Sequence, residues 1–347
     1  GHSASYSNTT GSRNVAVGRI ALYTNSTGNY NSAFGYGALY SNTVDDNTAV
    51  GYQSLNATTT GSDNTALGYT SLQSNTTGTN NVAIGSSASY LNTTGSYNVS
   101  VGHASLYQNT ASYNTAVGYQ SLYSNTTGGD QVAVGARALY TNSTGVENTA
   151  VGFDAMYYNT TGNYNVAVGL YALRYNSTAS YNTAVGYQAA YSNTTGANNT
   201  AVGNTTLYAN TTGTANAAFG GGISGSVFAT LSSNTTGNYN SAFGIGALGL
   251  NTTASNNTAV GYQAGYSNTT GTTSTVIGRQ AGYSNTTGAN TLIGDQAGYF
   301  ITTGTSNVGV GRYVLNANAG TNTGNYNVAV GDNALSSNTT ASNNTAV

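Results

Sequence analysis

A 17-residue block recurs along the whole chain and constrains the fold more than any other feature. Each block begins with a Gly, passes through an Asn-Thr-Thr-Gly segment and ends in a segment such as Asn-Thr-Ala-Val. Counted from that Gly there are 20 repeats, of which fifteen are 17 residues long, three are 16 and two are longer. Helix-pair repeats need about 33 residues or more, and Gly, Asn and β-branched residues disfavour helix. The block therefore predicts one turn of a β-solenoid.

The predicted fold is all-β, a parallel β-solenoid (a β-roll or β-helix) of about 20 rungs with two or three short strands in each rung. Rungs spaced about 4.8 Å apart would give a rod of about 95 Å. Residues 1–347 form a single continuous array in this interpretation, and the longer repeat after Gly220 places a loop insertion at 221–233. The chain opens on a repeat Gly and closes one residue before the next Gly is due. This pattern predicts a segment of a longer fibre, or subunits that stack head to tail.

Recurrence within the chain separates inward from outward positions. Repeat position 17, as in Val17, is always apolar, position 16 is nearly always Ala, and position 5, as in Leu22, is usually Leu. Positions 2 and 3 vary freely and include Arg19, His103, Asp154 and Asp295. We therefore assign Val17 and Leu22 to core columns and positions 2 and 3 to solvent.

Two consecutive apolar positions at 16 and 17 bear on how the chain packs with others. Neighbouring residues of a strand point to opposite sides of the sheet, so both faces would be apolar. One face can be the core of the solenoid, and the other then needs a partner, either in a parallel trimer or in a fibre bundle. The alternative is that the Gly after position 17 bends the chain and turns both side chains inward.

Composition excludes several functional classes. Only 4% of the residues are charged, against about 25% in an ordinary soluble domain. Two His, no Lys and eight scattered acids leave no acid–base machinery, so we expect no enzyme and no cofactor. Six Arg spread over the chain cannot form a nucleic-acid footprint. No apolar run is long enough for a membrane span, and His2 and His103 lie too many rungs apart to share a metal ion.

The turn motif Asn-[Thr/Ser]-Thr is formally an acceptor for N-linked glycans and recurs about once per repeat. Its candidate residues are Asn8, Asn25, Asn75, Asn92, Asn125, Asn142, Asn159, Asn176, Asn193, Asn210, Asn234, Asn251, Asn268, Asn285 and Asn338, and the adjacent Thr9, Thr10, Thr126 and Thr127 are candidates for O-linked glycans. The alternative is an asparagine ladder, in which side-chain amides form hydrogen bonds from rung to rung.

Two further columns are assigned structural roles. Position 14, as in Asn14, precedes the apolar segment and predicts a second, internal asparagine ladder. Position 6, as in Tyr23, predicts a stack of aromatic rings along the solenoid; an exposed Tyr stripe would instead bind sugars or partner fibres.

The motif Asn-[Thr/Val/Ser]-Ala-[Val/Ile/Phe]-Gly occurs at Asn14–Gly18, Asn81–Gly85 and Asn165–Gly169. It resembles the head repeat of YadA-type trimeric autotransporter adhesins, and similar repeats occur in phage and bacterial tail-fibre proteins. The resemblance covers the whole chain. It implies a left-handed parallel β-roll in an extracellular fibre, usually a trimer.

Three functions follow as hypotheses. The first is a structural extracellular or cell-surface filament that assembles with further copies of itself, with glycans on its turns. The second is an adhesin or tail-fibre shaft that binds surface carbohydrate through the Tyr stripe or the 221–233 insertion. The third is ice binding by Thr-rich arrays, for which the Thr pairs beside the turn Gly are poorly placed.

Overall fold

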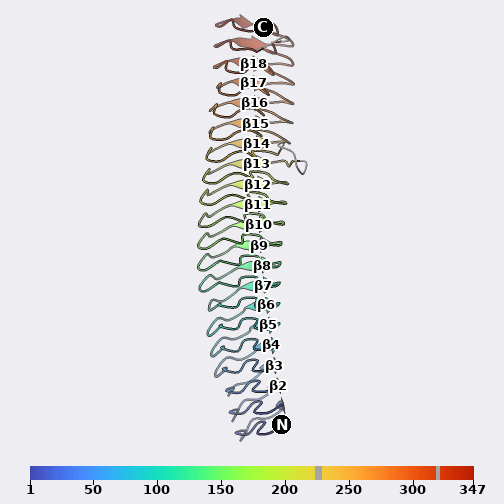
Figure 1. Ribbon diagram of the computed structural model, residues 1–347, viewed down its shortest axis with the longest axis vertical. Helices are drawn as coiled ribbons and strands as arrows, with labels where there is room; N and C mark the ends of the chain where they lie inside the picture. Colours follow the sequence, from blue (N-terminus) through green and yellow to red (C-terminus); the bar gives the residue numbers. More distant parts are fainter. Residues whose placement is uncertain (223–228, 318–320) are drawn as a thin grey trace. The chain divides into compact units, whose positions relative to one another are not determined.

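The computed structural model is all-β in the residues that it describes, which are 1–222, 229–317 and 321–347. The chain divides into two compact units, Gly1–Val168 and Gly169–Val347, called here the N-terminal and the C-terminal unit. Within each unit, consecutive rungs follow one another as a parallel β-solenoid (Figure 1). The predicted fold class is confirmed.

Each rung contributes one short strand at repeat positions 15 to 17. In the N-terminal unit the strands are β1 (Val15–Val17), β2 (Ser32–Phe34), β3 (Thr48–Val50), β4 (Thr65–Leu67), β5 (Val82–Ile84), β6 (Val99–Val101), β7 (Thr115–Val117), β8 (Val132–Val134), β9 (Thr149–Val151) and β10 (Val166–Val168). In the C-terminal unit they are β11 (Thr183–Val185), β12 (Thr200–Val202), β13 (Ala217–Phe219), β14 (Ser241–Phe243), β15 (Thr258–Val260), β16 (Thr275–Ile277), β17 (Thr291–Ile293), β18 (Val308–Val310), β19 (Val328–Val330) and β20 (Thr345–Ala346).

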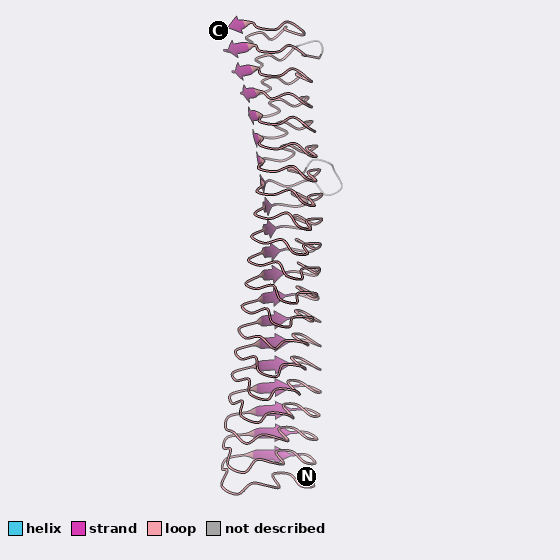
Figure 2. Ribbon diagram, turned by 90° about the vertical axis from the view of Figure 1, so that its left-hand side faces the viewer, coloured by secondary structure: helices cyan, strands magenta, loops and turns pink. Residues whose placement is uncertain are grey.

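The strands pair in parallel and in the register of the repeat. In β1 and β2, for example, Ala16 lies beside Ala33 and Val17 beside Phe34. Figure 2 shows these strands in magenta along one side of the rungs of each unit, with turns and loops on the other sides. Equal positions of successive repeats therefore stack into columns.

The expectation of two or three strands per rung is wrong for the described residues, which form one. Positions 3, 5 and 13 have positive φ angles, as in Ile20 at 52°, Leu22 at 52° and Tyr30 at 58°. These residues turn the chain without ending the bonding between rungs, since the Leu22 amide donates to the Ala38 carbonyl at 2.9 Å. The backbone outside the strands is thus satisfied by neighbouring rungs, as buried backbone must be.

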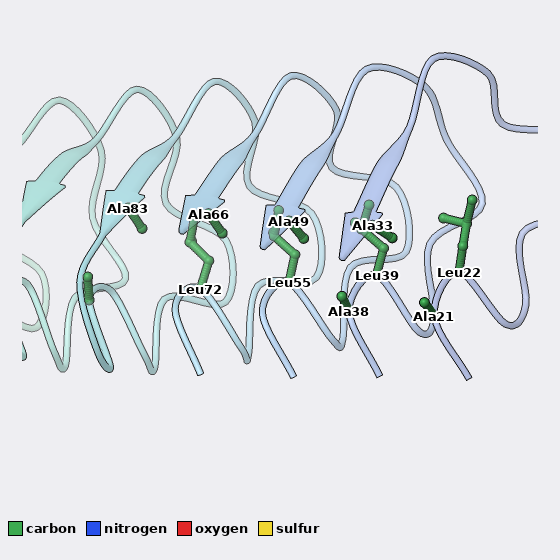
Figure 3. Close-up of a cluster of buried hydrophobic side chains, with 11 residues drawn as sticks. Ala21, Leu22, Ala33, Ala38, Leu39, Ala49, Leu55, Ala66, Leu72 and Ala83 are labelled. Carbon is green, nitrogen blue, oxygen red and sulfur yellow. The ribbon is translucent and has the colours of Figure 1, made fainter. Parts of the chain in front are cut away.

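The core is a thin layer of Leu and Ala between the strand and the opposite turn. Leu22, Leu39, Leu55 and Leu72 at position 5 are fully buried, as are the strand residues Ala33, Ala49 and Ala66. Figure 3 shows these Leu side chains pointing from the turn toward the Ala of the strands. The assignment of Leu22 to the core is confirmed.

The repeat Gly at position 1 is required by close backbone stacking. Gly18 has a φ of 136°, a conformation that L-residues rarely adopt. A Cβ placed on Gly18 would lie 2.6 Å from the carbonyl carbon of Gly35 in the next rung. Any side chain here would push adjacent rungs apart and break the strand ladder beside it.

Part of the predicted insertion at 221–233 lies outside the described residues, namely 223–228. Of the described part, Gly222 donates its amide to the Asn204 carbonyl at 3.0 Å, and Leu231 re-enters the core fully buried.

Candidate functional surface

The outward face of the sheet is the main surface feature of both units. In each strand the middle residue points inward, and positions 15 and 17 point outward, as the burial of β4 shows for Thr65, Ala66 and Leu67. Val17 is 53% exposed, so its assignment to the core is wrong. The alternation of side chains along a strand decides this, because the inward Ala at position 16 leaves its two neighbours outside.

We call the position-17 residues of each unit the outer column. Its exposed members are Val17, Phe34, Leu67, Ile84, Val134 and Val168 in the N-terminal unit, and Val185, Phe243, Val260, Ile277, Val310, Val330 and Val347 in the C-terminal unit. The members between them are half-buried, and Phe219 and Phe243 stack with ring centroids 4.9 Å apart. The apolar residues at positions 16 and 17 therefore lie on opposite faces of the sheet, and the alternative of two inward side chains is wrong.

The turn asparagines at position 8 form an internal ladder. The Asn142 side-chain nitrogen donates to Asn125 Oδ1 at 3.0 Å in the preceding rung and to the Gly145 carbonyl at 3.0 Å in its own turn. Thirteen of the fifteen candidate asparagines are buried, the exceptions being Asn8 and Asn338.

This burial overturns the glycan hypothesis at most of these positions. An N-linked glycan would occupy the same nitrogen atom that forms the ladder, and the folded rung leaves no room for it. The buried candidates are Asn25, Asn75, Asn92, Asn125, Asn142, Asn159, Asn176, Asn193, Asn210, Asn234, Asn251, Asn268 and Asn285. Even in the more exposed Asn8 and Asn338, the nitrogen donates to the carbonyl three residues on, at 3.0 and 2.9 Å.

The two Thr of the turn differ in their surroundings. The first forms a hydrogen bond to the next rung, with Thr9 Oγ1 donating to the Ser26 carbonyl and Thr126 Oγ1 to the Ser143 carbonyl, both at 2.9 Å. The second, Thr10 or Thr127, is exposed. O-linked glycans at the second Thr stay a prediction.

The position-14 ladder is confirmed. The Asn31 amide donates to Asn14 Oδ1 at 2.9 Å, and Asn14 Nδ2 donates to the Gly28 carbonyl of the next rung at 2.7 Å. The same contacts recur along both units, for instance from the Asn216 amide to Asn199 Oδ1 at 3.0 Å. Two asparagine ladders thus flank the Leu and Ala core and fix the vertical register of the rungs.

Tyrosine rings at position 6 stack face to face. Tyr23 lies between Tyr6 and Tyr40, with centroids 5.2 Å apart on both sides and planes within 6°. A longer stack runs from Tyr90 to Tyr157 in the same unit. Burial first, and then the neighbouring tyrosines, raise the pKa of Tyr107 above its ordinary value. Because each ring inside a stack is covered by its neighbours, it offers an edge and a hydroxyl to the surface but no free face.

Charged side chains pair along the columns of positions 2 and 3. Arg137 contacts Asp154 at 3.0 Å, and this carboxylate is almost fully buried, so the expectation that Asp154 faces solvent is wrong. Arg279 contacts Asp295 at 2.8 Å and Arg312 contacts Asp332 at 2.9 Å, both at the surface. Sequence reasoning treated these positions as unrelated variable sites. The recurrence of Arg and Asp at one repeat position in successive repeats is the signal that could have found them.

The adjacent acids Asp45 and Asp46 line a shallow hollow with Asp63. Asp45 Oδ1 accepts hydrogen bonds from the Asn29 amide and side chain, so it supports the turn of the preceding rung. Within the described ranges, no group of three or more His, Cys, Asp or Glu is arranged to hold a metal ion. The same ranges contain no helix that is long and apolar enough to cross a membrane.

No protein-family model matches the chain, and no curated protein matches it significantly. The functional argument therefore rests on the outward face of the sheet, the stacked columns and the paired charges.

Proposed function

We propose that this protein is a structural fibre component, in which the solenoid is a stiff shaft and the outer column joins it laterally to further copies of the same chain. The outer column supports the proposal most directly. Each unit presents an apolar side chain on every rung of one sheet face, and monomeric soluble proteins rarely expose apolar patches larger than a few hundred Å².

The interior supports a role in providing length and stiffness. Two asparagine ladders, the Leu and Ala core and the Tyr stacks repeat similar contacts over runs of successive rungs. A surface with so little charge suits a filament whose sides are covered by neighbouring copies. An extracellular or cell-surface location and a relation to YadA-type repeats belong to the same proposal.

The proposal is tested by making the outer column polar without changing its shape. Replacing Val117, Val134 and Val151 with Thr keeps the size and the β-propensity of three successive outward residues. We expect the wild-type protein to form oligomers or fibres in analytical ultracentrifugation and the triple variant to shift toward monomer.

The matched control is Leu91→Thr, which makes an exposed apolar residue of a turn polar and leaves the sheet face intact. Equal association of all three proteins would contradict the role of the outer column. A wild-type protein that stays monomeric at every concentration would contradict lateral assembly altogether.

In the structure, the Tyr columns support a carbohydrate-binding shaft less well than they do in the sequence. Sugars stack on exposed aromatic faces, whereas the faces inside the stack from Tyr90 to Tyr157 cover one another. Residues 223–228 of the insertion, the other candidate for recognition, lie outside the described residues.

Ice binding would use the outward sheet face and not the Thr pairs of the turns. Thr258, Thr275 and Thr291 lie side by side at position 15 of three paired strands, next to the outer column. Thermal hysteresis of the wild-type protein that disappears on replacing these three Thr with Lys would favour this function over lateral assembly.

A further inference from the structure

Four charged residues of the C-terminal unit form one column of alternating sign. Arg279, Asp295, Arg312 and Asp332 all occupy repeat position 2, each directly after the Gly that follows one of the strands β16 to β19. These strands are paired in order, so the four residues lie on consecutive rungs. The chain has only 14 charged residues, and these four form its longest run of charges at one repeat position on consecutive rungs.

Within the chain, the column forms two separate ion pairs. Arg279 donates two hydrogen bonds to Asp295, at 2.8 and 3.0 Å, and Arg312 donates two to Asp332, at 3.1 and 2.9 Å. Arg279, Arg312 and Asp332 keep about half of their side-chain surface exposed, and Asp295 about a third. The hydrogen bond from Arg312 lowers the pKa of Asp332, so this carboxylate is ionised at neutral pH.

The charge column accompanies the apolar outer column. Two residues before each charge stand Ile277, Ile293, Val310 and Val330, which are exposed or half-buried on the sheet face. Each rung therefore presents one apolar side chain and one charge, and the sign of the charge alternates from rung to rung.

We propose that a second copy of the chain packs antiparallel against this surface, about a two-fold axis between the rungs of Asp295 and Arg312. The proposal rests on the lateral assembly proposed above and specifies its direction and register. Reversing the order plus, minus, plus, minus gives minus, plus, minus, plus. Arg279 then lies opposite Asp332 of the second copy, and Asp295 lies opposite Arg312 of the second copy, so all four levels bring opposite charges together.

A parallel arrangement with aligned rungs lacks this complementarity. In a parallel dimer or trimer with aligned rungs, Arg279 of one copy lies at the level of Arg279 of the next, and each of the other three charges likewise meets its own kind. Like charges across an interface disfavour that register. The sequence-based expectation of a parallel trimer is therefore an outcome that the experiment must separate from the antiparallel pair.

The size of the contact sets the expected affinity. Strands β15 to β20 and the charge column cover roughly 29 by 17 Å, or about 500 Å² per partner, from the rung and residue spacings. Specific stable interfaces bury about 800 Å² per partner. We therefore expect a micromolar dissociation constant, at which the register of the charges decides whether a pair forms.

Charge-neutral exchanges test the register. Arg312→Asp combined with Asp332→Arg changes the order to plus, minus, minus, plus, which is no longer complementary to its own reverse. The exchange keeps the net charge and allows the pair within the chain to re-form. We expect self-association, measured by sedimentation at low salt, to weaken at least tenfold.

The matched control exchanges all four residues, Arg279→Asp, Asp295→Arg, Arg312→Asp and Asp332→Arg. The order becomes minus, plus, minus, plus, which is complementary to its own reverse again, so association should return to within about threefold of wild type. A general effect of mutation would weaken both variants, and that result would overturn the proposed register.

Single cysteines report the direction independently, because the chain contains no Cys. Thr275→Cys and Val328→Cys place thiols on β16 and β19, which face each other in the antiparallel pair. A mixture of the two variants should form the mixed disulfide, and each variant alone should form little homodimer. Homodimers of each variant alone would establish the parallel arrangement and overturn the proposal while leaving lateral assembly intact, whereas a monomeric wild type would contradict lateral assembly itself.

Discussion

The core of the N-terminal unit and the core between Gly261 and Gly311 fill the same space in opposite ways. In the first, position 5 is Leu, as in Leu55 and Leu72, and the strand contributes Ala. In the second, position 5 is Gly in three successive repeats, and the strand contributes Val276 and Leu292, both buried. In the rungs of Val276 and Leu292, a larger strand residue thus takes the place of the Leu that position 5 supplies in the first core.

Backbone conformation explains why both solutions are stable. Position 5 has a φ near 50° with Leu and near 60° with Gly. A left-handed conformation costs an L-residue roughly 1–2 kcal/mol, and full burial of a Leu side chain contributes about 1.5–3 kcal/mol. Leu at this position is therefore favourable on balance by a small margin, and Gly with a larger strand residue gives a comparable result.

Removing the large residue from either core gives the largest expected effect. Leu55→Ala in the first core and Leu292→Ala in the second should each lower the free energy of unfolding by about 2–5 kcal/mol, through lost burial and a residual cavity. Chemical denaturation measures both. A loss below about 1 kcal/mol in one variant would show that its core does not depend on that side chain.

Adding Leu to the second core should destabilise it because its volume is already occupied. A Cβ on Gly298 would lie 2.7 Å from Leu292 Cδ1 and 2.9 Å from Ile301 Cδ1. We expect Gly298→Leu to lower the free energy of unfolding by about 1–3 kcal/mol or more.

The double variant of Gly298→Leu with Leu292→Ala recreates the Leu and Ala arrangement of the first core. It should be more stable than the sum of its single variants by about 1–2 kcal/mol. Additive effects would mean that the two cores are not exchangeable.

The two regions also interrupt the position-8 ladder differently. Thr58 replaces Asn in the first region, and its buried hydroxyl has no hydrogen-bond partner among the described residues. Ile301 replaces Asn in the second, where it is fully buried next to Gly298.

Thr58→Asn should restore the ladder between Asn42 and Asn75 and raise the free energy of unfolding by about 1 kcal/mol. The reverse exchange Asn125→Thr is the control and should destabilise; a neutral or destabilising Thr58→Asn would mean that Thr58 is not a defect.

Alkaline pH should give the smallest effect, and the Tyr stack of the second region is one place to test it. Burial first, and then neighbouring tyrosines, raise the pKa of Tyr266 and Tyr283. The unfolded chain releases these protons near pH 10, whereas the folded chain retains them to higher pH. The contribution of these two hydroxyls to the free energy of unfolding is therefore complete below about pH 10, and it is lost as the pH rises through the folded pKa values.

Thermal unfolding followed between pH 9 and 12 checks this sign. Tyr266→Phe with Tyr283→Phe should unfold with a weaker dependence on pH than wild type in that range. An unchanged dependence would show that these two hydroxyls do not carry the effect.

The repeat predicted the fold class, the Leu22 column, the Asn14 ladder and the Tyr23 stack, because one residue type at one repeat position must stack on itself. The repeat alone could not decide whether the Val17 side chain faces the core or the solvent. An apolar residue next to an inward Ala can point either way, unless the two are known to be neighbours on one strand. The repeat also left the turn asparagines open between a glycan acceptor and a ladder, and the structure shows the ladder. Each of these buried side chains donates a hydrogen bond to a carbonyl three residues further on, as Asn142 does to Gly145. The Gly that regularly stands at that place in the sequence is the signal that could have predicted this bond.

The sequence shows Gly in place of Leu at position 5, but it does not show which residue fills the space that Leu would occupy. Only the structure shows that Leu292 fills the space above Gly298. Likewise, the alternating sign of the charges at position 2 became apparent only when the structure placed their strands on consecutive rungs.

Cryo-electron microscopy of the untreated protein tests the central claim most directly, because it shows the sheet face and its surroundings together. The account predicts laterally associated solenoids that touch through the outer column, with layers about 4.8 Å apart along each of them. Solenoids that stay separate, or that touch only through their turns with the outer column facing solvent, would contradict it.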